Sequence, residues 1–167
     1  IDIVMKNFIK IISVFALGLF MSASCEDNRL EGMCDDQVYF LNSGTQVIKV
    51  SKRDYADVPF TIYKAGIGQT SASVDVLVDE QLLEKLNEEN GTSYKLLDEN
   101  CYTIKETHFD FAAKDVSVSS SIEFDGAAIG SFQSIAVKEY VLPLALRSTS
   151  NVSEKLGYIL LVPVLEK

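Results

Sequence analysis

The sequence contains no tryptophan and a single histidine, and both shortages narrow the functions open to it. Tryptophan offers the largest aromatic face on which a sugar ring can pack, so a glycan site would have to rely on other aromatic residues. Histidine is the side chain that most often transfers protons in catalysis. His108 stands between Thr107 and Phe109 in an alternating stretch, which indicates an exposed position on a strand. No histidine-dependent active site is expected.

Other catalytic signatures are missing as well. The sequence has no GxSxG motif, which would place a serine nucleophile on a strand-to-helix turn. Gly66-Ile67-Gly68 is a fragment of a dinucleotide-binding motif without a helix behind it, and it predicts a turn. No CxxC or Cys/His spacing supports a metal site, and the acidic residues lack the alternating spacing of a calcium loop. We expect neither a cofactor nor a metal.

Basic residues are outnumbered, with 15 lysines and arginines against 24 aspartates and glutamates and a formal net charge of −9. Nucleic acids and anionic lipid surfaces are polyanions, and an acidic protein is repelled by them. The composition therefore argues against a nucleic-acid partner. Attachment to a membrane would have to come from something other than a basic patch.

The first 24 residues resemble the signal peptide of a bacterial lipoprotein. Lys6 and Lys10 precede an apolar run over residues 11–21, and small residues at 22–24 lead directly to Cys25. The run is about half of the roughly 20 residues that a membrane-spanning helix needs. We therefore expect acylation of Cys25 and cleavage before it, with an ordinary secretory signal as the alternative. Removing this segment takes away two lysines and one aspartate, which changes the net charge from −9 to −10.

The acidic segment over residues 25–37 is expected to tether the lipid to the folded domain, because it lacks apolar periodicity. Glu26-Asp27, directly after the acylated cysteine, resembles the surface-export signal of Bacteroidetes lipoproteins; a merely soluble linker is the alternative. We expect a lipid-anchored protein of the outer membrane, on the cell surface or alternatively on the periplasmic face. In that oxidising compartment, Cys34 and Cys101 either form a disulfide or remain two buried thiols.

Over residues 38–167 the apolar residues largely alternate with polar ones, which is typical of half-buried strands. Seven or eight such strands with turns between them predict an all-β, two-sheet sandwich formed by one domain. Pro59 predicts that its strand lies at a sheet edge or starts there. The stretch over 158–165 is almost continuously apolar and predicts a central strand that is buried on both faces.

One segment breaks the alternation and predicts a short helix over about 80–90. Asp79 can cap its start, and Asn90-Gly91 can end it. About ten residues are too few for a helix to be stable alone, so we expect it to pack on a sheet. Its apolar stripe consists of Leu82, Leu83 and Leu86.

The order of these segments resembles a particular domain of Bacteroidetes surface lipoproteins. The residues that carry the resemblance are VDVLVDEQLLEKLNEENGTSYKLLDENCYTI, then DVSVSSSIEF, then EYVLPLALRSTSN and YILLVPVLE. They are similar to a domain of unknown function at the N-terminus of lipoproteins encoded in polysaccharide-utilisation loci. In that family, a carbohydrate-binding domain or a glycoside hydrolase usually follows. The resemblance covers about 38–167 and implies an immunoglobulin-like two-sheet β-sandwich with one inserted helix.

Tyrosine is the aromatic residue most suited to a glycan site here, and three of the seven are the candidates. Tyr94 and Tyr102 lie near the loop from the helix to the next strand, and Tyr55 lies in a polar turn. The alternative is that each ring simply packs against the core or a sheet edge. Tyr140 and Tyr158 are in phase with apolar neighbours and are expected in the core. Carboxylates are so abundant that no pair can be assigned to glycoside hydrolysis.

These observations predict a non-catalytic protein that binds glycan or mediates adhesion as an accessory in polysaccharide utilisation. The alternative is a spacer or assembly domain that contacts an outer-membrane transporter or a glycan-binding lipoprotein without binding glycan itself. Exposed tyrosines gathered with polar residues would favour glycan binding. An apolar patch or an unpaired edge strand would favour protein contact.

Overall fold

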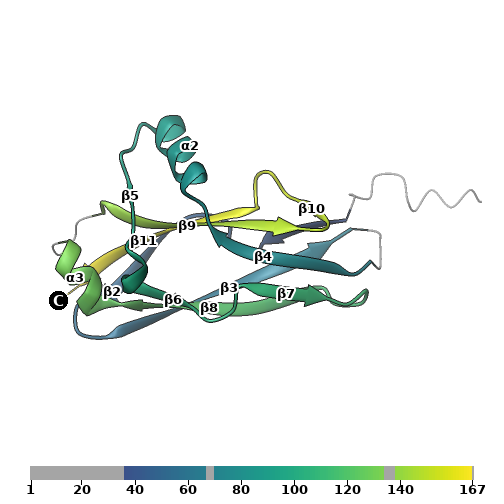
Figure 1. Ribbon diagram of the computed structural model, residues 1–167, viewed down its shortest axis with the longest axis horizontal. Helices are drawn as coiled ribbons and strands as arrows, with labels where there is room; N and C mark the ends of the chain where they lie inside the picture. Colours follow the sequence, from purple (N-terminus) through teal and green to yellow (C-terminus); the bar gives the residue numbers. More distant parts are fainter. Residues whose placement is uncertain (1–35, 67–69, 134–137, 167) are drawn as a thin grey trace, which may run out of the picture. The chain divides into compact units, whose positions relative to one another are not determined.

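Two β-sheets lie face to face in the computed structural model, which describes residues 36–66, 70–133 and 138–166 (Figure 1). The strand order is β10-β1-β3-β8-β6 in the first sheet and β2-β11-β9-β4-β7 in the second. The short strand β5 (Lys95–Leu96) pairs with β9. The strands of the first sheet are β1 (Gln37–Phe40), β3 (Tyr55–Ala65), β6 (Tyr102–Ile104), β8 (Ser117–Asp125) and β10 (Asn151–Val152). Those of the second are β2 (Gly44–Ser51), β4 (Ala72–Val78), β7 (His108–Phe111), β9 (Tyr140–Ser148) and β11 (Tyr158–Glu166).

The core lies between the sheets and is filled by alternate residues of their strands. Val38 and Phe40 of β1 belong to the same buried cluster as Leu144 of β9. Phe60 of β3 links the layers, because its ring lies edge-on to Phe40 at 5.9 Å and to Phe109 of the second sheet at 6.2 Å. These contacts confirm the predicted two-sheet, mostly β architecture.

Strand β11 is buried on both of its faces, as its apolar run predicted. Ile159 and Leu161 join the core between the sheets. The alternate residues face outwards, where helix α2 (Glu80–Asn90) covers them (Figure 1). The parallel pairing of β11 with β2 and its antiparallel pairing with β9 make it an interior strand. The cluster beneath the helix consists of Leu83, Leu86, Val141, Leu160 and Val162.

Helix α2 begins and ends where the sequence predicted. The side chain of Asp79 accepts a hydrogen bond from the backbone N–H of Leu82 at 3.0 Å, which satisfies one free donor of the first turn. Gly91 ends the helix in the left-handed region, with φ of 63°. Asn87 then fixes the following loop, because its side chain accepts from the N–H of Tyr94 and donates to the C=O of Tyr94, both at 2.9 Å.

Pro59 lies in the middle of β3, an interior strand, so the prediction of an edge strand or a strand start was wrong. The register explains why proline is tolerated there. The C=O of Thr61 accepts from the N–H of Leu41, so residues two apart on β3 turn their backbone groups towards the β1 side. Of the residues in β3, only Ile62–Ala65 pair with β1. The nitrogen of Pro59 therefore points past the end of β1, where no donor is needed.

A second helix, α3 (Gly126–Phe132), corrects the prediction of a single inserted helix. The side chain of Asp125 caps it by accepting from the N–H groups of Ala127 at 2.8 Å and Ala128 at 3.0 Å. Ile129 is its only large buried side chain. A seven-residue helix with one buried side chain has no apolar stripe, which is the signal that sequence analysis uses.

The predicted signal peptide, the lipidation at Cys25 and most of the acidic tether fall on residues 1–35, outside the described residues. They stay predictions, as does the pairing of Cys34. Within the described ranges, neither α2 nor α3 has the length and apolar character that crossing a membrane requires.

Gly126→Ala is expected to destabilise the domain, because an added Cβ would lie 1.8 Å from the backbone oxygen of Ser51. Gly130, in the same helix, meets only the flexible side chain of Lys52, at 3.1 Å, and alanine favours a helix over glycine by about 1 kcal/mol. Urea unfolding should show a loss of roughly 1–3 kcal/mol for Gly126→Ala and no loss for Gly130→Ala. Equal stability of the two variants would contradict the close packing of α3.

Candidate functional site

Three strands bring inward-facing side chains to the end of the sandwich where α3 lies (Figure 1). Val78 is the last residue of β4, Tyr102 the first of β6 and Tyr140 the first of β9. All three pack against the core without being fully buried. Beyond them the strands stop, so each side chain has apolar neighbours on one side and an open space on the other.

That space is an open hollow of about 630 Å³, here called the aromatic hollow. Its volume is within the roughly 300–1,000 Å³ that is typical of small-molecule sites. The remaining walls come from the start of α2, from β5, from the 3₁₀ helix η2 (Glu99–Cys101) and from the end of α3. The lining residues are Val78, Glu80, Leu96, Leu97, Asp98, Glu99, Tyr102, Phe132 and Tyr140.

Phe132 and Tyr140 form an aromatic pair in the aromatic hollow. Their ring centroids are 6.3 Å apart and the planes are tilted by 59°. Phe132 is 46% exposed, which is unusual for a side chain of its size and leaves its ring free to contact a ligand. The ammonium of Lys95 lies 5.7 Å from the centre of the Tyr140 ring and pairs with the carboxylate of Glu139. The hydrogen bond to Glu139 raises the pKa of Lys95, so this lysine stays charged.

Three carboxylates line the side of the aromatic hollow that α2 and η2 supply. Asp98 is held in place, because one of its oxygens accepts from the backbone N–H of Asn100 at 2.9 Å and from the side-chain amide at 2.7 Å. Glu80 and Glu99 are exposed to solvent. Burial, followed by the charges of Glu99 and Asp98, raises the pKa of Tyr102. The phenol therefore keeps its proton at neutral pH and can both donate and accept a hydrogen bond.

Cys101 lies behind this wall and is fully buried. Desolvation, followed by the charges of Asp98 and Asp125, raises the pKa of its thiol to about 11. It is a free cysteine among the described residues. Cys34 lies outside those residues, so a Cys34–Cys101 disulfide stays a prediction. A thiol with so high a pKa is a poor nucleophile at neutral pH.

The three predicted tyrosines do not come together. Tyr102 lines the aromatic hollow. Tyr94 packs against the cluster beneath α2 and lines a separate hollow of about 430 Å³ with Lys138 and Glu139. Tyr55 is 66% exposed at the start of β3 and pairs with Asp125, one register step from the inward-facing Ala56, so it lies on the outer face of the first sheet.

Two aromatic residues of this site were not among the candidates predicted from the sequence. Tyr140 was expected in the core because it is in phase with inward-facing residues, and it does face inwards. Its position at the first residue of β9, where the sandwich ends, leaves it half-buried instead. Phe132 belongs to α3, the helix that was not predicted. The sequence signal that could have indicated this helix is Asp125 before Gly126, because aspartate is a favoured N-cap residue.

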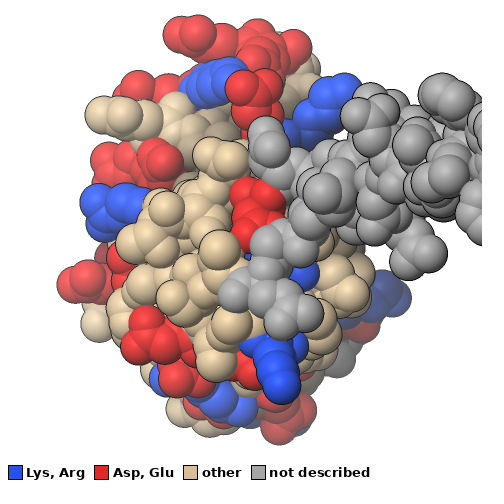
Figure 2. Space-filling view, turned by 90° about the vertical axis from the view of Figure 1, so that its right-hand side faces the viewer, with Lys and Arg blue, Asp and Glu red and all other residues tan. Residues whose placement is uncertain are grey.

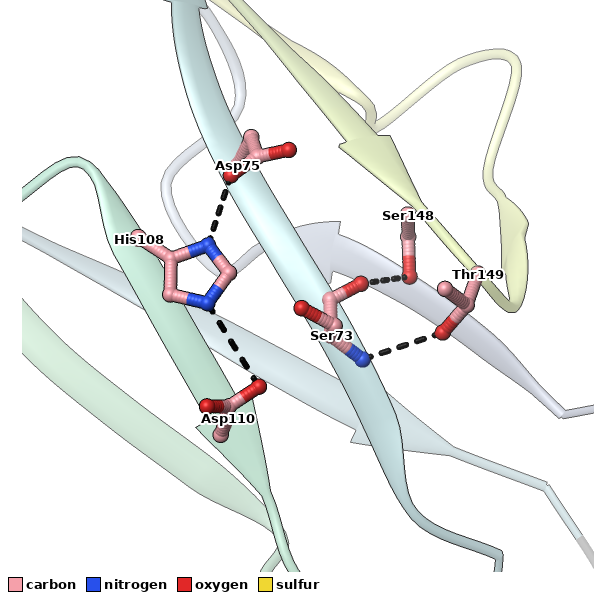
Figure 3. A network of polar contacts seen from close by, with 6 residues as sticks. All are labelled: Ser73, Asp75, His108, Asp110, Ser148 and Thr149. Atoms are coloured by element: carbon pink, nitrogen blue, oxygen red, sulfur yellow. Dashed lines mark hydrogen bonds and ion pairs between the residues drawn. The ribbon is translucent and has the colours of Figure 1, made fainter.

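His108 lies exposed on the edge strand β7, as predicted, and contacts Asp75 of β4 and Asp110 of its own strand (Figure 3). Its Nδ1 lies 2.7 Å from a carboxylate oxygen of Asp75, and its Nε2 lies 3.5 Å from Asp110. Nearby, the backbone N–H of Ser73 donates to the hydroxyl of Thr149 at 3.0 Å. The carboxylates hold the imidazole from both sides, and nothing in this arrangement presents a nucleophile to it.

The described residues contain no arrangement of side chains that would form a metal centre, and at one end of the sandwich they form no basic patch (Figure 2). No group of three or more His, Cys, Asp or Glu side chains in residues 36–66, 70–133 and 138–166 is arranged to hold a metal ion. Figure 2 shows the end of the sandwich opposite α3, where acidic and basic side chains are interspersed. A polyanion would find no continuous positive surface on the described part of that face.

The comparison with protein families agrees with an N-terminal module. A family model described as "-like, N-terminal domain" matches residues 34–153, more than half of the chain. The chain belongs to this family of N-terminal domains. No curated protein matches the sequence.

Solved structures of Bacteroides proteins share the fold of this family member. A proposed carbohydrate-binding protein from Bacteroides ovatus has a TM-score of 0.62 and 17% identity, covering 77% of this chain and 36% of that one. A multidomain protein that includes DUF1735, also from Bacteroides ovatus, has a TM-score of 0.53 and 21% identity, covering 77% and 44%. EndoBT-3987 from Bacteroides thetaiotamicron, solved with its Man5GlcNAc product, has a TM-score of 0.51 and 15% identity, covering 72% and 28%. The chain therefore spans less than half the length of each of these structures.

The pKa of His108 should lie above the ordinary histidine value, chiefly because of the hydrogen bond to Asp75 and further because of the charge of Asp110. With one histidine in the chain, a single imidazole signal can be followed by NMR as the pH is changed. Asp75→Asn should lower this pKa more than Asp110→Asn. A raised pKa stabilises the folded protein below the ordinary value, and this contribution disappears as the pH rises through the raised one. An unchanged pKa in Asp75→Asn would contradict the ion pair.

Proposed function

We propose that this protein is a non-catalytic lipoprotein whose sandwich domain binds glycan in the aromatic hollow. The observation that carries the proposal is the gathering of Tyr102, Phe132 and Tyr140 in one open space with carboxylates beside them. Aromatic faces pack on the apolar C–H surfaces of sugars, while carboxylates and phenols bond their hydroxyl groups. A hollow with both components on rigid strand and helix ends suits such a ligand.

The strand arrangement supports an immunoglobulin-like fold for this domain. The neighbours β1-β3-β8-β6 correspond to the four-stranded A-B-E-D sheet of an immunoglobulin domain, and β11-β9-β4 correspond to its G-F-C sheet. Many unrelated functions use this fold, so it does not by itself argue for glycan binding. In such a fold the proposed site would lie at one end of the sandwich, where the loops and short helices are.

The structural relatives give the proposal its biological setting. One is described as a proposed carbohydrate-binding protein, and another was solved with an oligosaccharide product. Those descriptions concern longer proteins, whose activities can reside outside the shared part. Together with the resemblance to lipoproteins of polysaccharide-utilisation loci, they support an accessory role in polysaccharide utilisation or adhesion.

The carboxylates of the aromatic hollow do not resemble a hydrolytic pair. A general acid in glycoside hydrolysis needs a carboxyl group whose pKa is raised, usually by burial in apolar surroundings. Glu80 and Glu99 are exposed, and Asp98 is engaged in capping η2. These features support a binding role and not a catalytic one.

The proposed location follows from the N-terminal sequence. The apolar run, the small residues and Cys25 support lipid anchoring in the outer membrane, and Glu26-Asp27 supports the cell surface over the periplasmic face. Replacement of the lipidated cysteine should release the protein in soluble form.

An assembly role is the second candidate, and it has its own observation. Strand β2 lies at the edge of the second sheet, and Val47 near its middle is 55% exposed. Leu41 and Leu156 are also exposed, and they lie close together because the C=O of Leu156 accepts from the N–H of Phe40. An unpaired edge with apolar side chains suits contact with a transporter or a partner lipoprotein.

Glycan binding can be tested by affinity electrophoresis against plant, host-mucin and microbial polysaccharides. Phe132→Ala and Tyr102→Ala should each weaken binding roughly tenfold, because each removes an aromatic face from the aromatic hollow. Tyr55→Ala is the matched control, since it removes an exposed ring on the outer face of the first sheet. Loss of binding in Tyr55→Ala alone would move the site to that face. No retardation by any polysaccharide would favour the assembly role.

A further inference from the structure

We propose that the aromatic hollow selects uncharged, hydroxyl-rich sugars and rejects polysaccharides that carry carboxylate or sulfate groups. This inference rests on the proposed function, because it names the class of glycan that the same site takes.

The charge of the lining is the first observation. Glu80, Asp98 and Glu99 are acidic, and none of the described lining residues is a lysine or an arginine. Recognition of sugar carboxylates or sulfates normally uses arginine or lysine, which supply charged hydrogen-bond donors. The aromatic hollow offers such a ligand only negative charges at close range.

The lysine beside the aromatic hollow does not change this balance. Lys95 contacts the Tyr140 ring, but its ammonium is paired with the carboxylate of Glu139. An anionic sugar would have to displace Glu139 from Lys95 to gain a partner. The exchange would pair the sugar carboxylate with Lys95 but leave the carboxylate of Glu139 without its partner, so the number of ion pairs would not increase.

The carboxylates also have free capacity to accept hydrogen bonds. The side chains of Glu80 and Glu99 form no hydrogen bond or ion pair with other described residues. Each can therefore accept from the hydroxyl groups of a sugar, and such bonds to a charged acceptor are stronger than neutral ones. The rings of Tyr102 and Phe132 remain for the C–H surfaces of the same sugar.

The negative charges of the lining carboxylates also affect Tyr102, a neighbouring residue of the aromatic hollow. Burial raises the pKa of Tyr102 most, and the charges of Glu99 and Asp98 raise it further, which means that these carboxylates disfavour a negative charge on its oxygen. A uronate or sulfate at that place would be disfavoured in the same way. The Debye length is about 8 Å at 0.15 M salt, so the repulsion acts across the aromatic hollow and weakens as salt is added.

The test uses glucan, mannan and galactan backbones, each in an uncharged and a carboxymethylated form, in affinity electrophoresis of the purified full chain at low salt. Retardation should occur with an uncharged form and be absent with its carboxymethylated counterpart. The double variant E80Q/E99Q should gain roughly three- to tenfold in affinity for the carboxymethylated form. E84Q/E88Q is the matched control, because it makes the same net-charge change at exposed positions of α2 outside the lining.

Each outcome decides a separate point. Equal retardation of the unaltered protein by both forms of a backbone would overturn the selection for uncharged sugars and leave glycan binding standing. An equal gain in E80Q/E99Q and E84Q/E88Q would also overturn it, because overall charge and not the lining would then cause the discrimination. Retardation by carboxymethylated forms alone would likewise overturn the selection and leave glycan binding standing. Absence of retardation by every form, charged or uncharged, would reject glycan binding and the sugar class together.

Discussion

Strand β11 carries apolar side chains on both faces, and a two-sheet sandwich encloses only one of them. The outer face needs a cover, which α2 provides by packing on Val141, Leu160 and Val162. Strand β4 leads into α2 on the outside of the second sheet, whereas β6 belongs to the first sheet. The chain must therefore cross the end of the sandwich between them, and β5 and η2 make that crossing (Figure 1). The crossing supplies one wall of the aromatic hollow.

The composition of the aromatic hollow follows from this position. A residue at the inner face of a strand end has the core on one side and solvent on the other, which suits the apolar ring and polar tip of Tyr102 and Tyr140. Two of the carboxylates lie where helices start: Glu80 opens α2 and Asp98 caps η2. Helix N-termini favour acidic side chains, so the route of the chain brings aromatic rings and negative charges to one place.

The features with a strong sequence period were predictable. The alternation gave two sheets, the continuous apolar run predicted β11, and the one break predicted α2 with both of its ends. Pro59 was misread because the outcome depends on how far β1 extends, which is a property of the pairing and not of the strand itself. Tyr102 was found from its loop. Tyr140 was missed because the alternation of a strand shows which face a residue lies on but not how near it is to the end of the sandwich. Phe132 was missed because its helix, α3, has no apolar stripe.

The most direct test of this account is to map where a retarding glycan binds, using amide chemical-shift changes in ¹⁵N-labelled protein titrated with an oligosaccharide of that class. The account predicts that the largest shifts cluster at residues 96–102, at Phe132 and at Tyr140, with little change on the outer face of the first sheet around Tyr55. Shifts concentrated on that outer face or along β2, with the aromatic hollow unchanged, would contradict it.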